Sequence, residues 1–256
     1  MREHEPKATS LDGFISGAHR LSRRGFLAFG TLAAVGCASS GVRTSRTPDL
    51  PDRVLQVPPP KPVVCPPVIP SKHSDLGVVL DRSVWSRGVP DRSKLNPMLP
   101  VRYITLHHDG LDAFLATDQY STADRIELIR VGHRGRGWAD IGYHYVVDRN
   151  GRVWEGRDMK WQGAHVQGRN EGNIGVLCLG NFELQSPSDK QLEATEQILS
   201  CLMQKHRVPP SRVLSHREWP DASTACPGKV LQREFVRMRR TELSRLAIPD
   251  DGTALV

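Results

Sequence analysis

Short apolar runs bounded by polar and turn-forming residues predict strands in the second half of the chain. Residues 101–107, 141–147 and 173–179 are rich in β-branched and aromatic side chains, and 152–155 is a shorter run of the same kind. Asp148-Arg-Asn-Gly151 separates two of these runs and is typical of a tight turn. We therefore expect strands at these positions, with 141–147 and 152–155 paired as a hairpin.

Longer segments with one apolar side predict helices between and after these strands. We expect a helix from Ser121 or Thr122, as the cap, to about residue 134. A second helix is expected from Ser186, again as the cap, to His206, and an Arg-rich third helix at about 228–246. Strands that alternate with helices of this length predict an α/β fold, a single domain with a central mixed β-sheet flanked by helices.

The first part of the chain is typical of a processing segment followed by a tether. Arg23-Arg24 precedes a short apolar run, residues 28–36, and Cys37 follows directly. This order resembles a twin-arginine export signal that ends in a lipoprotein box. We expect a signal peptide at 1–36 and a Pro-rich tether at 37–76 that begins with lipidated Cys37.

The globular domain then covers residues 77–248, and 249–256 form a tail. With this organisation we expect a lipoprotein that leaves the cytoplasm by the twin-arginine route. Its lipid anchor would hold it on a membrane, facing the periplasm or the cell wall. The alternative is an accidental apolar patch with a buried cysteine, which the order of charge pair, apolar run and Cys37 disfavours.

Composition and charge change this picture little. The 256 residues are 38% hydrophobic and 25% charged, which is ordinary for a soluble domain. The net charge of +7 suggests an acidic partner, but no basic run carries interleaved aromatic residues, so we expect no nucleic acid. Five cysteines are too few for a disulfide framework, although a Cys178–Cys201 bond stays open. We expect a monomer.

Two separate stretches carry side chains suited to a metal ion. Side-chain alternation along the strand at 101–107 places Tyr103, Thr105 and His107 on one face. His216 and Cys226 lie in the second stretch, where Pro-Gly follows the cysteine and turns the chain. Two imidazoles and a thiolate suit zinc, and three protein ligands leave a fourth position for water, as in catalytic sites. We predict a Zn²⁺ site built from His107, His216 and Cys226.

Several short sequences in residues 77–245 occur in a recognisable order. They are Arg82-Ser-Val-Trp85, Tyr103-Ile-Thr-Leu-His-His108, Gly137-Trp-Ala-Asp-Ile-Gly-Tyr-His-Tyr145, Asp148 to Gly156, Gly163-Ala-His165, Asn173-Ile-Gly175, Gly180-Asn-Phe182 and His216 to Gly228. Together they resemble the type 2 N-acetylmuramoyl-L-alanine amidases, the family that includes the peptidoglycan recognition proteins. The resemblance implies a zinc amidase that acts on peptidoglycan or muropeptides. The bond cut would join the lactyl group of N-acetylmuramic acid to the L-alanine of the stem peptide.

The resemblance also implies roles for particular residues. The zinc-ligand positions of the family fall on the same His107, His216 and Cys226. The catalytic tyrosine falls on Tyr143, and a second polar group near the metal falls on Thr224. The candidates for substrate binding are His165, which matches a position lining the substrate groove, together with His108, Asn181 and Trp161.

The sequence departs from the family pattern at two places. The stretch between His216 and Cys226 is longer than usual through residues 219–221, so Thr224 is matched less securely than the ligands. Leu177 stands where some relatives carry a catalytic glutamate, which places the chain nearer the recognition-protein branch and assigns more of the proton handling to Tyr143.

Two other functions stay open from the sequence. A non-catalytic recognition module would hold peptidoglycan without cutting it, but such members usually lack a ligand, most often the cysteine, and here all three positions are filled. A structural zinc site would need a fourth protein ligand, for which His108 and Asp109 are the candidates. We favour the zinc-dependent amidase.

Overall fold

The computed structural model describes residues 68–69, 79–250 and 252. All of them belong to the compact unit Gln56–Val256. The expected signal peptide at 1–36, the lipidation site Cys37 and almost all of the tether at 37–76 lie outside the described residues, so these assignments stay predictions. Within the described residues, no helix combines the length and the apolar character needed to cross a membrane.

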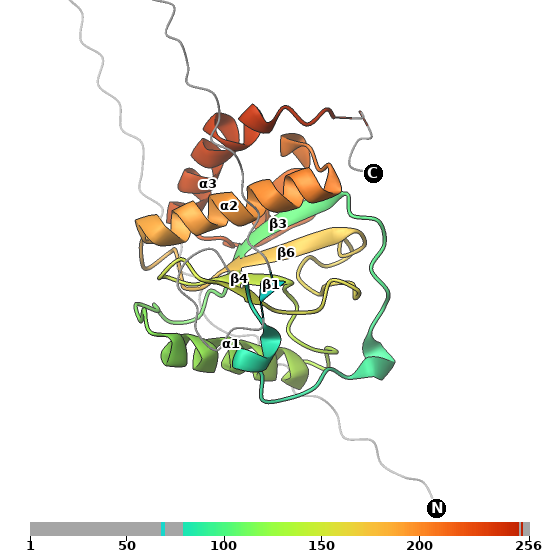
Figure 1. Cartoon of the computed structure of the whole chain (residues 1–256), viewed down its shortest axis with the longest axis vertical. Coiled ribbons are helices and arrows are strands. Elements are labelled where there is room, and N and C mark those ends of the chain that lie inside the picture. Colours follow the sequence, from blue (N-terminus) through green and yellow to red (C-terminus); the bar gives the residue numbers. More distant parts are fainter. Residues whose placement is uncertain (1–67, 70–78, 251, 253–256) are drawn as a thin grey trace, which may run out of the picture. The chain divides into compact units, whose positions relative to one another are not determined.

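In the described part of the chain, seven strands form one mixed sheet in the order β1-β2-β5-β4-β6-β3-β7 (Figure 1). Their bounds are β1 Val68–Ile69, β2 Val79–Leu80, β3 Tyr103–His108, β4 Tyr145–Val147, β5 Val153–Glu155, β6 Asn173–Cys178 and β7 Val213–Ser215. Strands β4 and β5 pair antiparallel as the predicted hairpin, and the other neighbouring pairs are parallel. The central mixed sheet is therefore confirmed.

Helices cover both faces of this sheet. Figure 1 shows α2 (Asp189–His206) and α3 (Lys229–Thr241) on one face and α1 (Gln119–Gly135) on the other. The apolar side chains of β3 and β6 that point toward α2 and α3 form the larger core with those helices. A second core lies between α1 and the opposite face, where Ile126 and Ile129 pack near Trp154 and Leu177. Short 3-10 helices are Arg82–Val84, Arg92–Lys94, Pro210–Arg212, His216–Glu218 and Leu243–Leu246.

The helix starts differ from the predicted ones. Helix α1 is capped by Asp118, whose carboxylate accepts a hydrogen bond from the N–H of Ser121 at 2.7 Å. Helix α2 is capped by Ser188 in place of Ser186, with the hydroxyl accepting from the N–H of Gln191 at 3.1 Å. Both caps are side-chain acceptors of the preferred kind, and the sequence offers several such residues at each start. The last helix ends at Thr241 and continues only as a 3-10 turn.

The predicted strand at 141–147 is shorter than expected. Only Tyr145–Val147 joins the sheet as β4, because the carbonyls of Gly142 and Tyr143 bond to loop residues. The carbonyl of Gly142 accepts from the N–H of Ala164 at 3.0 Å, and the carbonyl of Tyr143 accepts from the N–H of Arg157 at 2.7 Å. This irregular segment carries Tyr143 toward the end of β3.

The cysteine pair left open by the sequence is not bonded. Cys178 lies in β6 with its Sγ 3.1 Å from Thr195 Oγ1, and no disulfide joins it to Cys201 in the described structure. Both cysteines belong to the buried interior on the side of α2. They are structural residues of the core.

Candidate metal centre and cleft

Parallel strand pairing brings the two predicted histidine ligands together. Strands β3 and β7 are parallel neighbours in which Leu106 is opposite Ser215. His107 and His216 each follow that pair by one residue, so both side chains leave the carboxyl edge of the sheet side by side. The rings lie 4.7 Å apart between centroids.

A short 3-10 helix holds His216 at the end of β7. The N–H of Ser215 donates to the carboxylate of Glu218 at 2.8 Å, which closes the helix at its start. The guanidinium of Arg239, on α3, donates to both oxygens of Glu218 at 2.7 and 2.8 Å. A bidentate ion pair of this kind fixes the orientation of the Glu218 carboxylate as well as its position.

Cys226 reaches the same place from the loop that precedes α3. The N–H of Arg217 donates to the carbonyl of Cys226 at 3.1 Å and closes the loop back on the His216 helix. The N–H of His108 donates to the Sγ of Cys226 at 3.4 Å. These two contacts tie the thiol to both ligand-bearing segments.

The three side chains form a group that fits a zinc ion. One ligand atom from each of His107, His216 and Cys226 lies within 4.8 Å of the others. The Nδ1 of His107 is 3.6 Å from the Sγ of Cys226. Tetrahedral zinc, with bonds of about 2.0 Å to nitrogen and about 2.3 Å to sulfur, requires a ligand separation of about 3.5 Å. The donor set therefore suits zinc, and so does the separation of the His107 and Cys226 ligand atoms.

The electrostatics of the group also suit a cation. Burial, with smaller contributions from neighbouring histidines, holds the pKa of His107 well below its usual value, and burial lowers that of His216. Both rings are therefore neutral near pH 7 and offer lone pairs. Burial raises the pKa of the Cys226 thiol to about 12, so a bound cation is needed to stabilise its thiolate.

The two candidates for a fourth protein ligand are engaged elsewhere. The Nδ1 of His108 accepts from the N–H of Phe182 at 3.2 Å. The carboxylate of Asp109 accepts from Arg125 at 3.1 and 3.2 Å and from the N–H of Gly180 at 3.1 Å. Within the described residues, neither of them joins the ligand group. A site with an open fourth position is favoured over a structural zinc site.

Tyr143 lies beside the group. Its ring centroid is 5.1 Å from that of His107. Burial raises the pKa of Tyr143, and the nearby Cys226 and Asp109 raise it further, so the hydroxyl keeps its proton at neutral pH. The side chain can therefore serve as a hydrogen-bond donor.

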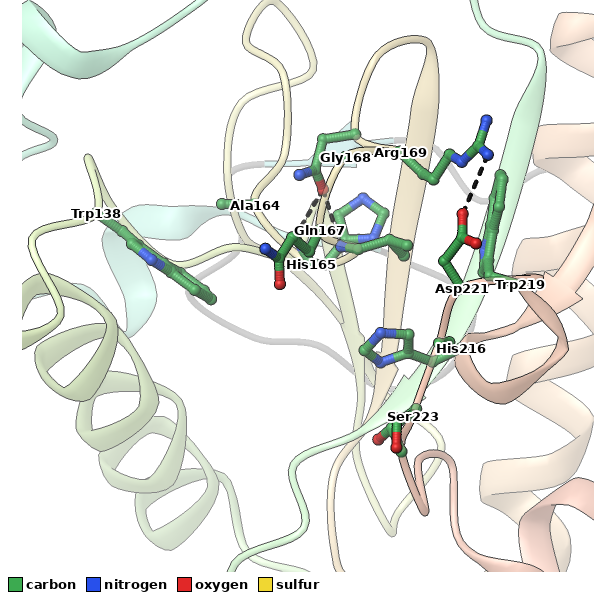
Figure 2. Close-up of a pocket in the computed structure, with 14 residues that line it drawn as sticks. Trp138, Ala164, His165, Gln167, Gly168, Arg169, His216, Trp219, Asp221 and Ser223 are labelled. Atoms are coloured by element: carbon green, nitrogen blue, oxygen red, sulfur yellow. Dashed lines mark hydrogen bonds and ion pairs between the residues drawn. The ribbon is translucent and has the colours of Figure 1, made fainter. Parts of the chain in front are cut away.

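A cavity of about 660 Å³ opens beside His216. Figure 2 shows Trp138 on one side of it, with Arg169 paired to Asp221 on the other. Thr224 also lines the cavity, and its hydroxyl accepts from the N–H of Cys226 at 3.1 Å. The other lining residues are Ala164, His165, Val166, Gln167, Gly168, Asn170, Trp219, Ala222 and Ser223.

The predicted substrate-binding residues are distributed unevenly around this cavity. His165 lines it, whereas His108, Asn181 and Trp161 are not among its lining residues. The side-chain amide of Asn181 donates to the carbonyls of Gly110 and Leu111 at 3.2 and 2.7 Å and holds that loop. A substrate role for these three residues stays a prediction.

Sequence reasoning missed Trp138, Arg169 and Asp221 at the cavity rim. Two of them carry a signal in the sequence. Trp138 lies in a quoted motif, Gly137 to Tyr145, and Asp221 lies in the stretch that is longer than the family pattern. Nothing in the sequence pairs Arg169 with Asp221, because they come from separate loops.

Comparison with known proteins identifies the family to which this chain belongs. Residues 97–229 match the family model described as N-acetylmuramoyl-L-alanine amidase, and this range contains all three metal-site residues. The chain belongs to this amidase family. The matched range begins before β3 and ends at the start of α3, so it also contains Tyr143 and the cavity-lining residues.

Relatives of this amidase-family chain include both recognition proteins and amidases. It is 30% identical over 167 residues to a peptidoglycan-recognition protein of Drosophila simulans, covering 64% of this chain and 89% of that protein. It is 33% identical over 154 residues to N-acetylmuramoyl-L-alanine amidase of Sus scrofa, covering 59% of this chain but 25% of that longer protein.

The structure of bumblebee PGRP-SA resembles this fold with a TM-score of 0.55 and 27% identity, over 62% of this chain and 93% of that one. The family fold is thus established from both sequence and structure.

Proposed function

We propose that this chain is a zinc-dependent N-acetylmuramoyl-L-alanine amidase. Its reaction would hydrolyse the amide bond between the lactyl group of N-acetylmuramic acid and the L-alanine of the stem peptide. The observation that carries the proposal is the group of His107, His216 and Cys226, with ligand atoms within 4.8 Å of one another beside an open cavity. Membership of the amidase family and the presence of amidases among the relatives support it.

His107, His216 and Cys226 would hold the ion, and three protein ligands would leave a fourth coordination position for water. When bound, zinc supplies the Lewis-acid chemistry that activates water and polarises an amide carbonyl. The Tyr143 hydroxyl, which keeps its proton, donates a hydrogen bond to the oxygen on which negative charge develops. Thr224 lies at the cavity wall two residues from Cys226, where its hydroxyl can orient the attacking water.

The first experiment measures zinc content and muropeptide cleavage on the purified full chain, with and without a chelator. We expect one zinc per chain and release of the stem peptide that stops when zinc is removed. Cys226→Ser should lose both zinc and hydrolysis. Full turnover in a Cys226→Ser protein that still binds zinc would refute the ligand assignment.

Tyr143→Phe separates metal binding from catalysis. This variant should retain zinc and lose about 100-fold or more in turnover, because a preorganised donor to an oxyanion contributes on that order. Unchanged turnover would remove Tyr143 from the mechanism. If wild-type protein binds zinc and muropeptide without cleaving it, the chain is a recognition module instead.

We also propose that the chain is exported through the twin-arginine route and anchored by lipid on Cys37. The order Arg23-Arg24, apolar run and Cys37 supports this, and the Pro-rich tether would give the amidase domain reach from the membrane. Mass spectrometry of the mature N-terminus and membrane fractionation of Cys37→Ser test it. A Cys37→Ser protein that still sediments with membranes would contradict the anchor.

A further inference from the structure

The two ring nitrogens of His107 face different partners. Its Nδ1 is 3.6 Å from the Sγ of Cys226, on the side of the proposed metal. Its Nε2 is 3.1 Å from the Nδ1 of His165. A neutral imidazole carries one proton, so only one of its nitrogens has a lone pair for a metal. The partner of Nε2 therefore determines whether His107 is ready to bind zinc.

A main-chain carbonyl fixes the direction of this hydrogen-bond chain. The Nε2 of His165 is 3.1 Å from the carbonyl oxygen of Asn173, and a carbonyl can only accept. In a neutral His165 the proton therefore sits on Nε2, and Nδ1 is an acceptor. That acceptor takes the Nε2–H of His107, which leaves the Nδ1 lone pair of His107 directed to the Cys226 side.

The ring of His165 is held in this orientation by its surroundings. A methyl group added at Gly163 or Gly175 would lie 2.5 or 2.6 Å from the Cδ2 of His165, so both positions must lack a side chain for the ring to fit. The N–H of His165 donates to the side-chain oxygen of Asn170 at 2.8 Å. The residue is buried, with a relative exposure of only 7%. A ring this enclosed cannot turn without displacing its neighbours.

The side chain of Asn173 ties this residue to the two ligand-bearing segments. The hydroxyl of Thr105, two residues before His107, donates to the side-chain oxygen of Asn173 at 2.9 Å. The indole N–H of Trp219, three residues after His216, donates to that hydroxyl at 3.0 Å. Asn173, whose main-chain carbonyl orients His165, is thus anchored through its side chain to Thr105 of β3, and Thr105 is in turn bonded to the loop that follows His216.

We propose that His165 is a positioning residue for the metal site and that it selects the tautomer in which the Nδ1 of His107 binds zinc. This inference rests on the proposed zinc function and deepens it. It differs from the substrate-groove role implied by sequence resemblance. A residue of the groove would act on muropeptide binding, whereas a tautomer-selecting residue acts on zinc affinity before any substrate is present.

The test compares His165→Phe with His165→Asn in the full chain. Phenylalanine fills the site without an acceptor, whereas asparagine offers an oxygen near the position of Nδ1. We expect zinc affinity, measured by competition with a chromophoric chelator, to fall about 10- to 100-fold in His165→Phe, the usual effect of losing such a partner. His165→Asn should recover part of that loss. His133→Asn is the matched control, because His133 is buried but bonds to no ligand, and its zinc affinity should equal that of wild type.

A second measurement does not depend on any variant of His165. Two-bond ¹⁵N–¹H NMR correlations on the zinc-free wild-type chain distinguish the two tautomers of His107, whose signals are assigned by their loss in His107→Asn. We expect the proton on Nε2. A proton on Nδ1 would overturn the inference even if His165→Phe failed to fold.

The outcomes separate this inference from the proposed function. If wild-type protein binds no zinc, the proposed function fails, and the NMR result still tests the tautomer. If wild-type and His165→Phe proteins bind zinc equally and only the KM for muropeptide rises, the positioning role is refuted while the amidase stands.

Discussion

Replacing His133 by asparagine tests how burial of a neutral histidine makes the fold sensitive to acid. His133 lies in the last turn of α1, where its ring packs 4.5 Å from that of Trp138. Its Nδ1 accepts the N–H of Gly142 at 3.0 Å, a bond that protonation of Nδ1 would break. Burial lowers the pKa of His133 to about 4, with smaller contributions from the positive charges of Arg136 and Arg157.

The sign and size of the effect follow from this shift. The unfolded chain binds a proton at His133 near pH 6.5, and the folded chain does so only near pH 4. The contribution of neutral His133 to the free energy of unfolding is therefore complete above pH 6.5 and is lost as the pH falls toward 4. At about 1.4 kcal/mol per pKa unit, His133 should remove about 2 kcal/mol from the free energy of unfolding between about pH 7.5 and pH 5.

The assay is urea unfolding of wild-type and His133→Asn proteins at both pH values in the presence of a chelator. Asparagine keeps an acceptor for the N–H of Gly142 but does not titrate. The free energy of unfolding of the His133→Asn protein should therefore fall by about 2 kcal/mol less than that of wild type on acidification. We also expect this protein to be less stable than wild type at pH 7.5. The other histidines titrate in both proteins and cancel in this comparison. An equal loss of stability in both proteins would refute the reasoning.

Three further substitutions test the supports of the site. Glu218→Ala removes the carboxylate that accepts two hydrogen bonds from Arg239. Urea unfolding should show that the free energy of unfolding falls by about 2–3 kcal/mol, and zinc binding should weaken. An unchanged unfolding midpoint would show that the Glu218–Arg239 ion pair is dispensable. Gly175→Ala places a methyl group 2.6 Å from His165, and should lower the free energy of unfolding by about 1–3 kcal/mol and lower zinc affinity. Gly132→Ala is the matched control for Gly175→Ala, because nothing lies within 4 Å of a methyl group added at that position in α1. The free energy of unfolding of this protein should rise by about 0.5–1 kcal/mol, and its zinc affinity should not change.

The parts of the fold that the sequence predicts well are those governed by local physics. Strands β3 and β6 are recognisable because β-branched runs buried on both faces are distinctive. The hairpin follows from its Asn-Gly turn, and α2 ends at His206 because two prolines follow closely. The three metal-site residues are predicted from residue chemistry and the family pattern; strand pairing brings the two histidines together, and the loop before α3 brings Cys226 to them. Their role as ligands stays a prediction.

The parts that the sequence does not predict depend on contacts between distant segments. The run at 141–147 has the composition of one strand, but its first half gives its backbone bonds to Ala164 and Arg157. The cavity rim likewise depends on contacts between distant segments, since Arg169 and Asp221 come from separate loops and pair only in the folded chain. The motif around His165 matches a groove position and so predicts substrate binding. Its bonds to His107 and to the carbonyl of Asn173 appear only when β3 and β6 pair.

The longer stretch between His216 and Cys226 shows how such an insertion is accommodated without displacing a ligand. The hydrogen bond from the N–H of Arg217 to the carbonyl of Cys226 closes the loop at its base. The additional length of the loop therefore does not displace the Sγ of Cys226. The added residues lie beyond that closure. There Trp219 is buried against Tyr103 and bonds to Thr105, and Asp221 reaches the cavity rim. The departure from the family pattern is therefore compatible with the group of His107, His216 and Cys226, and it places Asp221 at the cavity rim in an ion pair with Arg169.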